Sequence, residues 1–398
     1  MKAPAGRLLF SGKAAAILAA GFSASAYLFF LLATLPAVPF HPDEATYIYM
    51  SRDLDRMISL GPLSVCWSAE KKSDPLQTER ERDCPLARYA IGAARGIAGL
   101  PATAANWDWS ADWELNWRQG AVPSNEVLIL ARIPQALLLF AAVLLMARIG
   151  WKLGGGAGAL TAAVLFGLNS QVLLHGRRAM SESALLFGMI LTIAVLMEQK
   201  RESGRGARRF GFPLMAGAAL ALAALAKYSG LLLAPVALAG MFFFTGESSP
   251  RKIFLQGIAR CGVMILGFLS VFLVLNPVFW CDPAGTLSAV VAERQRLMGE
   301  QLAGLQSAAP GVVLGTPGLR LLAVPYELFI APLAFWEIPN YAAQTAAAER
   351  AYLAQPFNTL INGGLPSALF AVLVFAGLIL SILRVFRKKT DSSWVLLW

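Results

Sequence analysis

Apolar residues in this chain form long continuous runs rather than the short alternating patterns that are typical of strands. Eight runs come close to or exceed the length of about 20 residues that a helix needs to cross a bilayer core of ~30 Å. They cover residues 15–38, 127–148, 157–175, 183–198, 212–226, 229–245, 261–280 and 360–384. The pattern predicts an all-α, polytopic membrane protein with about eight transmembrane helices.

Composition supports this fold class. Hydrophobic residues make up 57% of the 398, charged residues 15%, and the mean hydropathy is +0.58. Soluble domains lie nearer 45–50% apolar and about 25% charged. The excess of apolar residues is therefore too large for an ordinary soluble domain.

The formal net charge of +10 could suggest nucleic acid as a partner, but the basic residues have a different distribution. Half of the 34 lie before span one or just after spans two, four, six and eight. Alternation of this kind is the positive-inside pattern, which places both chain ends in the cytoplasm. We therefore expect membrane lipids as partners and no nucleic acid.

The N-terminal apolar run could be mistaken for a signal peptide. It exceeds the roughly 7–15 residues of a typical signal-peptide core, and no clear small-x-small cleavage site precedes His41. We interpret residues 15–38 as a retained first span.

Two connections are long, and both fall on the outer side: outer loop one, 41–125, and outer loop two, 281–358. Nothing between them has the composition of a separate soluble domain, so we interpret 1–398 as one transmembrane domain. The last residues, 393–398, resemble the opening of a further span. We expect the sequence to be a shortened version of a longer protein; the alternative is a surface tail anchored by two Trp residues.

Three polar-rich or proline-containing stretches in these loops favour interfacial helices over further spans. Residues 42–58 begin with Pro42, which suits a first helical position, and place apolar side chains at spacings of three and four. Residues 86–101 and 319–336 are apolar but short or interrupted. We expect all three to lie at the membrane surface.

A cluster of tryptophans in outer loop one has two interpretations. Trp107, Trp109, Trp113 and Trp117 lie within twelve residues, the last three at helical spacing. An aromatic belt at the membrane surface is one explanation. A wall for an acceptor or a sugar ring is the other.

The eight spans are nearly free of charge, and the exceptions lie at their outer ends. Ionisable groups at such positions are costly and usually have a partner or a task. With the acids that follow span one, they form a set at one membrane depth: Asp43, Glu44, Arg132, Arg177, Arg178, Glu182 and Lys227.

Four stretches around these residues resemble the motifs of the GT-C glycosyltransferases, above all the protein O-mannosyltransferases and the bacterial aminoarabinose lipid A transferases. Residues 40–47 (FHPDEATY) resemble the first acidic motif, and Arg132-Ile133-Pro134 opens the second span. Residues 177–185 (RRAMSESAL) resemble the second acidic motif, in which Asp is common where this chain has Glu182. Residues 223–230 (AALAKYSG) resemble the Thr-Lys-Tyr-Gly hairpin.

The resemblance covers about residues 1–240 and has one departure. Residues 85–89 (PLARY) resemble a Lys-Pro-Pro-Leu segment, but Asp83 and Cys84 stand where Lys-Pro is usual. A direct transfer of the lysine's role is therefore in doubt, and Arg88 is its candidate substitute.

The resemblance implies an inverting transferase that moves a sugar from a polyprenyl phosphate to a protein, lipid or glycan acceptor. A phosphate leaving group needs positive charge, for which Arg88, Arg132, Arg177, Arg178 and Lys227 are candidates. An acceptor hydroxyl needs a carboxylate base. We assign that role to Asp43, with Glu44 as its neighbour and Glu182 as a second, positioning acid. The expected location is a bacterial inner membrane, with the site on the periplasmic side.

Other readings of the sequence stay open. His41 and His175 are the only histidines and no Cys-x-x-Cys occurs, so a metal site has little support; a divalent ion stays possible because some GT-C relatives use one. A transporter or flippase is the alternative function, although the expected spans carry no charge near their middle. A second alternative function is the binding of a lipid-linked sugar by a non-catalytic protein.

A disulfide is expected in outer loop one. Cys66 and Cys84 both lie there, in an oxidising compartment if the host is bacterial. Cys281, just after span seven, is the competing partner.

Overall fold

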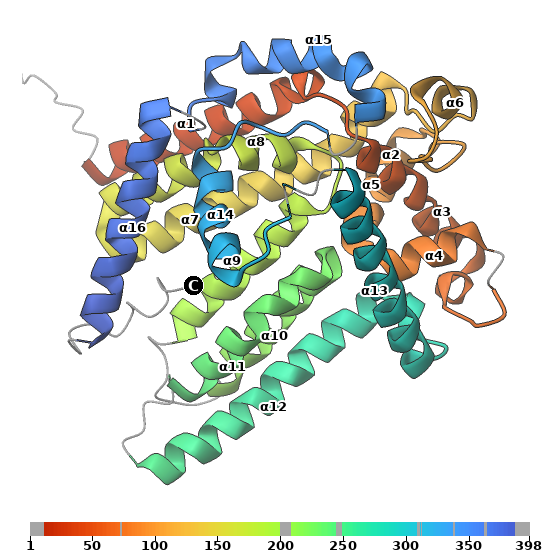
Figure 1. The fold of residues 1–398 in the computed structure, drawn as a ribbon. Helices are drawn as coiled ribbons and strands as arrows, with labels where there is room; N and C mark the ends of the chain where they lie inside the picture. Colours follow the sequence, from red (N-terminus) through yellow and green to blue (C-terminus); the bar gives the residue numbers. More distant parts are fainter. Residues whose placement is uncertain are drawn as a thin grey trace, which may run out of the picture.

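The computed structural model describes residues 12–71, 74–199, 208–243, 249–308, 311, 313–336, 339–361 and 364–386. Within these ranges the fold is all-α, which confirms the predicted class; the sole extended pairing described is an isolated bridge between Asn169 and Ile361. Figure 1 shows the helices, which are α1 (Gly12–Ala33), α2 (Pro42–Met50), α3 (Arg52–Leu60), α4 (Pro75–Arg82), α5 (Pro85–Ala98), α6 (Trp113–Arg118), α7 (Asn125–Gly167), α8 (Ser170–Arg177), α9 (Glu182–Gln199), α10 (Arg208–Ala226), α11 (Ala234–Phe243), α12 (Pro250–Leu275), α13 (Pro283–Ala308), α14 (Pro317–Phe329), α15 (Ala342–Leu353) and α16 (Gly364–Phe386). Several basic residues used for topology, and the terminal 393–398, lie outside the described residues.

Helix α7 contains a reversal of the chain that joins the second and third predicted spans. Gly155 has φ 61°, a left-handed conformation that glycine adopts without steric cost. A Cβ on Gly150 would collide with the backbone of Gly158, and one on Gly167 would touch Val143. The two limbs therefore run antiparallel and in close contact, with the Gly154–Gly156 triplet as the connector.

The predicted third span, 157–175, is not one straight helix. The second limb of α7 ends at Gly167, and α8 begins after Asn169, whose side chain caps it by accepting a hydrogen bond from the Val172 N–H at 3.1 Å. Helices α8 and α9 meet at an angle of 117°. This bend brings residues 177–182 to the outer end of the bundle.

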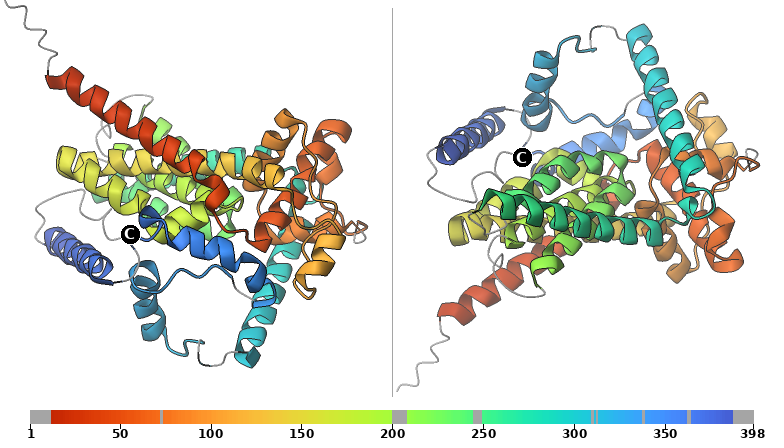
Figure 2. Two further views of the ribbon diagram at one scale, coloured as in Figure 1. Left: turned by 90° about the horizontal axis from the view of Figure 1, so that it is seen from above. Right: turned by 90° about the horizontal axis from the view of Figure 1, so that it is seen from below.

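Helices α9 to α12 pack around a common apolar core. Leu196, Leu220, Met241 and Met264 are buried in it. Helices α10 and α12 approach closely because Gly217 faces the backbone of Met264; such small residues let helices meet in a membrane. Figure 2 shows these helices side by side from two directions.

Of the described helices, α7 and α12 are long and apolar enough to cross a membrane, and the bent pair α8–α9 is a third if counted as one span. The other predicted spans correspond to shorter apolar helices. The total of eight crossings stays a prediction.

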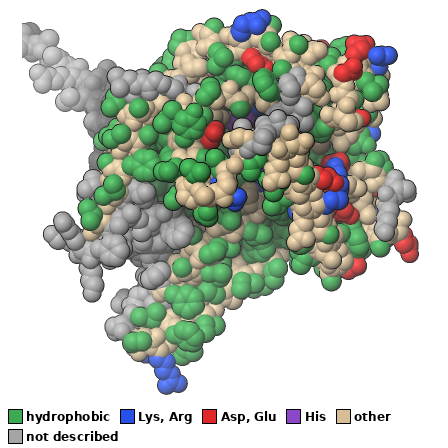
Figure 3. All heavy atoms as spheres, viewed as in Figure 1, with side chains coloured by type: hydrophobic (Ala, Val, Ile, Leu, Met, Phe, Trp, Pro, Cys, Tyr) green, Lys and Arg blue, Asp and Glu red, His purple; other side chains and the backbone are tan. Residues whose placement is uncertain are grey.

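Helices α2–α6 and α13 lie at one end of this bundle, whereas α14 lies beside α16 (Figure 1). Charged side chains gather over this end, on the right in Figure 3, whereas the surface along α12 is mostly apolar down to its basic start. The helices predicted over 86–101 and 319–336 are present as α5 and α14. The helix predicted over 42–58 is instead two helices, α2 and α3, that meet at Ser51.

The predicted disulfide between Cys66 and Cys84 is wrong, because Cys66 has another partner. Cys66 is bonded to Cys281, with a Cα–Cα distance of 5.8 Å, and Cys84 is a buried free thiol. The bond is possible because the backbone N–H of Trp67 donates to the Val278 carbonyl at 3.0 Å, which places the two loops edge to edge. The competing partner considered in the sequence is thus the observed one, and it links outer loop one to outer loop two.

Candidate functional site

The first turn of α2 forms as its sequence predicts. His41 is the N-cap residue, and its Nδ1 accepts a hydrogen bond from the Asp43 N–H at 3.2 Å. The Glu44 carboxylate reaches back to the His41 N–H at 3.0 Å, which completes a capping box. The two adjacent acids then point into different surroundings: the side chain of Asp43 is 35% exposed, and that of Glu44 is fully buried.

Glu44 lies in a buried clamp. Its two oxygens accept hydrogen bonds from Nε and Nη2 of Arg132, both at 2.7 Å, and Oε1 also accepts from the Ala179 N–H at 2.8 Å. Nη1 of Arg132 donates to the carbonyls of Leu35 and Val38 at 2.9 and 2.8 Å. Arg132 is therefore occupied by a bidentate carboxylate and two carbonyls, and it ties the starts of α2 and α7 together.

Arg177 and Arg178 are also buried, with different partners. Arg177 donates to Thr34 at 2.6 Å, to Tyr352 at 2.8 Å and to Asn358 at 2.7 Å. Arg178 donates to the Phe335 carbonyl at 3.1 Å, and burial lowers the pKa of its guanidinium, although the Glu44 carboxylate opposes that change. Both arginines join the 177–182 bend to outer loop two.

A second group of charged residues, which we call the open cluster, consists of three acids and one lysine: Asp43, Asp83, Glu182 and Lys227. The Lys227 ammonium lies 3.1 Å from Oε1 of Glu182, and their side chains are 42% and 24% exposed. Burial lowers the pKa of Lys227, but the carboxylates of Glu182, Asp83 and Asp43 outweigh it and raise that pKa above its usual value. Glu182 is thus the ion-pair partner of Lys227, and two further carboxylates, Asp83 and Asp43, act on it electrostatically.

Asp83 is the member that the sequence did not single out. It accepts a hydrogen bond from the Tyr47 hydroxyl at 3.2 Å, and burial raises its pKa even though Arg88 lies nearby. The available signal was the departure at residues 83–84 from the Lys-Pro-Pro-Leu pattern. The expected lysine position holds an acid here.

Arg88 has its ion-pair partner outside the open cluster. Its Nη1 lies 3.2 Å from the Asp53 carboxylate, and its Nη2 donates to the Asp83 carbonyl at 2.9 Å. Asp53 also accepts a bidentate pair from Arg80. Arg88 therefore belongs to a buried ionic network that fixes α3, α4 and α5 to one another.

The predicted tryptophan cluster is mostly inside the protein. Trp107, Trp109 and Trp113 pack with Phe40 and Tyr341, with ring centroids 5.7–6.4 Å apart. Such edge-to-face pairs stabilise a fold beyond the area they bury. Trp117, by contrast, is 59% exposed. The first three rings form an internal support beneath His41 rather than a belt.

Within the described residues, no group of three His, Cys, Asp or Glu side chains has an arrangement that could hold a metal ion.

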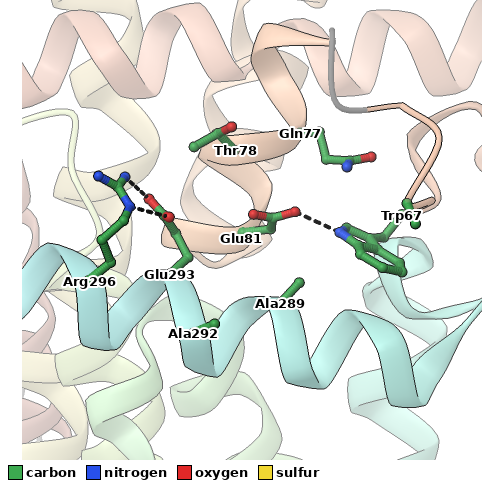
Figure 4. Close-up of a pocket in the computed structure, with 9 residues that line it drawn as sticks. Trp67, Gln77, Thr78, Glu81, Ala289, Ala292, Glu293 and Arg296 are labelled. Carbon is green, nitrogen blue, oxygen red and sulfur yellow. Dashed lines mark hydrogen bonds and ion pairs between the residues drawn. The ribbon is translucent and has the colours of Figure 1, made fainter.

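Two cavities, each of about 360 Å³, lie next to this region. One is apolar and is formed by α3, α5, α10 and α12, with Leu54, Leu86, Leu225 and Leu275 among its lining residues. The other is polar and lies between α4 and α13 (Figure 4).

Solved structures with some likeness to this chain include membrane glycosyltransferases. The Saccharomyces cerevisiae protein O-mannosyltransferase Pmt1–Pmt2 complex bound to the sugar donor is 17% identical, with a TM-score of 0.45 over 63% of this chain and 32% of that one. The Archaeoglobus fulgidus oligosaccharyltransferase in complex with Zn and sulfate is 14% identical, with a TM-score of 0.42 over 79% and 36%. This chain thus corresponds to about a third of each.

Among curated proteins, none matches this sequence closely enough to count as a relative. The family model for dolichyl-phosphate-mannose-protein mannosyltransferases matches residues 105–283, which include Arg132, Glu182 and Lys227. This match confirms the resemblance to the protein O-mannosyltransferases, a GT-C glycosyltransferase family, that the motifs indicate.

Proposed function

We propose that this protein transfers a sugar from a polyprenyl phosphate to an acceptor hydroxyl at the outer face of the membrane. The observation that carries the proposal is the open cluster, in which the partly exposed Asp43 carboxylate acts electrostatically on the Lys227 ammonium of the Glu182–Lys227 pair. A base and a cation close together are the two groups that this reaction needs.

The chemistry follows from the position of each group. The acceptor O–H gives its proton to the Asp43 carboxylate while its oxygen attacks the anomeric carbon. The bond from that carbon to the phosphate oxygen breaks on the opposite face, and the electron pair leaves with the polyprenyl phosphate. The anomeric centre is thereby inverted. Lys227 stabilises the negative charge that develops on the phosphate.

Glu182 has a positioning role in this scheme. It holds Lys227 in place before the donor binds, at 3.1 Å. A donor phosphate that approaches Lys227 competes with Glu182 for the same ammonium group. The carboxylate then accepts hydrogen bonds from the acceptor or orients Asp43.

The apolar cavity supports a lipid-linked donor. Two of its lining residues, Pro85 and Leu225, stand two positions from Asp83 and Lys227 respectively. An isoprenoid chain bound there would have its phosphate outside the cavity, near Asp83 and Lys227. Burial of each CH₂ contributes about 0.8 kcal/mol.

The fully buried charges are best explained as positioning residues. Glu44 and Arg132 satisfy each other, and Arg177 is enclosed by Thr34, Tyr352 and Asn358. Moving any of these groups to a donor phosphate would break buried hydrogen bonds. We propose that they hold Asp43 and the 177–182 bend at the correct separation.

The test is a transfer assay with purified protein, membranes and a panel of radiolabelled polyprenyl-phosphate sugars. We expect label to leave the polyprenol for at least one sugar and to appear on an acceptor. Retention of all label on every donor would refute the proposal.

Topology is tested separately with reporter fusions. We expect a cytoplasmic signal at Arg209 or Lys389 and an outer signal at Trp113 or Arg296. An outer signal at Arg209 would contradict the proposed orientation.

A further inference from the structure

The polar cavity between α4 and α13 is lined by aromatic, polar, charged and small apolar side chains (Figure 4). The Trp67 indole forms one side, Thr78 and Glu81 of α4 form another, and Arg296 of α13 stands at the far end. On the α13 side the lining includes Ala289 and Ala292, whose small side chains leave room for a ligand. Its volume of about 360 Å³ lies within the ~300–1,000 Å³ of typical small-molecule sites.

Trp67 is held in place from several directions. The preceding residue, Cys66, is bonded to Cys281, and the Trp67 N–H donates to the Val278 carbonyl at 3.0 Å. The next residue, Ser68, exchanges two hydrogen bonds with the Gln77 side-chain amide, at 3.0 and 3.3 Å. A ring fixed in this way is a preformed surface, because little side-chain entropy remains to be lost on binding.

The polar groups around the cavity are oriented before any ligand arrives. Oε1 of Glu81 accepts a hydrogen bond from the Trp67 indole N–H at 2.6 Å, which leaves the carboxylate with capacity for more. Glu293 accepts from Arg296 and Arg82, and these hydrogen bonds, set against partial burial, hold the pKa of Glu293 below its usual value. The guanidinium of Arg296 is thus fixed at the rim.

These groups fit a neutral polyhydroxylated ring better than an ion. Among the lining residues, Glu293 and Arg296 form an ion pair and Glu81 accepts a hydrogen bond from the Trp67 indole, so the charged groups are already engaged before a ligand binds. Hydroxyls both donate and accept, and can bond to carboxylate and guanidinium alike. The apolar face of a sugar ring matches the indole.

The cavity is directly connected to the open cluster. Glu81 lines the cavity, and Asp83, two residues further on, faces Tyr47 and Lys227. Two neighbouring residues of α13 are likewise shared between the cavity and the open cluster. Glu293 lines the cavity, and Arg294 acts electrostatically on Asp83. A ligand in the cavity therefore lies against two segments, around residues 81–83 and 293–294, that also act on the open cluster.

From this arrangement we infer that the cavity is an acceptor subsite that binds a saccharide residue, so that the acceptor is a glycan or a glycoconjugate. This inference rests on the proposed function, since it names the acceptor of the same reaction. A peptide acceptor is the competing possibility, which the test below includes.

Binding is tested without donor by ¹⁹F NMR of protein labelled with 5-fluorotryptophan. The Trp67 resonance is assigned by its loss in Trp67→Phe. We expect methyl glycosides of mannose, glucose or N-acetylglucosamine, titrated to tens of millimolar, to shift that resonance. The shift disappears in Ala292→Leu, which fills the cavity without removing a contact, and persists in the control Ala303→Leu on an exposed part of the same helix.

Kinetics supply a second measurement. In Ala292→Leu we expect the KM for a saccharide acceptor to rise at least tenfold, with hydrolysis of the donor in the absence of acceptor unchanged. No shift with any glycoside, a shift that survives Ala292→Leu, or a shift produced only by a Ser/Thr peptide would each overturn the saccharide subsite. Failure of donor cleavage in every variant and in the wild type would instead overturn the proposed function.

Discussion

Asp43 and Glu44 are neighbours in the first turn of one helix, yet they belong to two regions that differ in almost every physical respect. Glu44 lies in the buried clamp, where four hydrogen bonds from Arg132, His41 and Ala179 occupy both of its oxygens. Asp43 lies in the open cluster, partly exposed and close to Lys227. One acidic dipeptide therefore supplies both a buried ion-pair partner and a partly exposed carboxylate.

The difference shows how burial changes what a charged group can do. A fully buried ion pair loses its hydration, so it persists only when its geometry satisfies every atom. Such a pair resists rearrangement and is suited to fixing positions. A half-exposed group such as Asp43 or Lys227 keeps part of its hydration and can exchange partners during a reaction.

The largest effect is expected from breaking the clamp. Glu44→Gln preserves volume but leaves the Arg132 guanidinium buried without a counter-charge, which typically costs about 3–5 kcal/mol. We expect a large loss of thermal stability and of folded protein in detergent. Glu114→Gln removes an exposed pair with Arg118 and serves as the control, with an expected change of about 0–1 kcal/mol. Equal stability of the two variants would contradict the division into regions.

The next effect concerns Asp43 itself. Asp43→Asn retains size and hydrogen bonding but cannot take up a proton at neutral pH. Turnover should fall by at least ~10²-fold, while the melting temperature and donor binding stay near those of the wild type. A folded Asp43→Asn protein with wild-type turnover would exclude Asp43 as the base.

Lys227 and Glu182 should give smaller and separable effects. Lys227→Met removes the positive charge that faces the phosphate, and we expect donor affinity to fall by about tenfold, or ~1.4 kcal/mol. Glu182→Gln should reduce turnover less than Asp43→Asn, because the base remains. Donor titrations and single-turnover rates distinguish the two outcomes; unchanged donor affinity in Lys227→Met would remove Lys227 from the phosphate site.

The last effect is absent at neutral pH and is a dependence of stability on acidic pH. Burial, with contributions from Arg178 and His175, lowers the pKa of His41 to about 2 from an ordinary value of 6.5. The unfolded chain therefore binds a proton that the folded state does not. The stabilising contribution of neutral His41 is complete above pH 6.5 and is lost as the pH falls toward 2, by up to about 1.4 kcal/mol per pH unit.

His41→Asn isolates this contribution, since Asn is a good N-cap residue but does not titrate. Unfolding measured between pH 7 and pH 4 should show a shallower loss of stability in the variant. Identical slopes in the two proteins would show that His41 is not responsible.

Much of the architecture was predictable from the sequence, because it depends on local or one-dimensional patterns. Runs of apolar residues predict helices, and Pro42 predicts the start of a helix. The motifs also placed Asp43, Glu182 and Lys227 on one side of the bundle, as the fold has them. The kink at Ser51 and the break between Gly167 and Ser170, inside the predicted third span, were not predicted, because tertiary packing overrides the continuous helical pattern at both places.

Only the tertiary structure decided which partner each charged group has. The sequence contains an acid and several arginines at the same depth, but pairing Glu44 with Arg132 requires residues 88 positions apart to meet. The same holds for Cys66, whose partner Cys281 lies 215 positions away while Cys84 is close in sequence. Helix formation depends on neighbours three and four residues apart, whereas burial, ion pairing and disulfide choice depend on how whole helices pack.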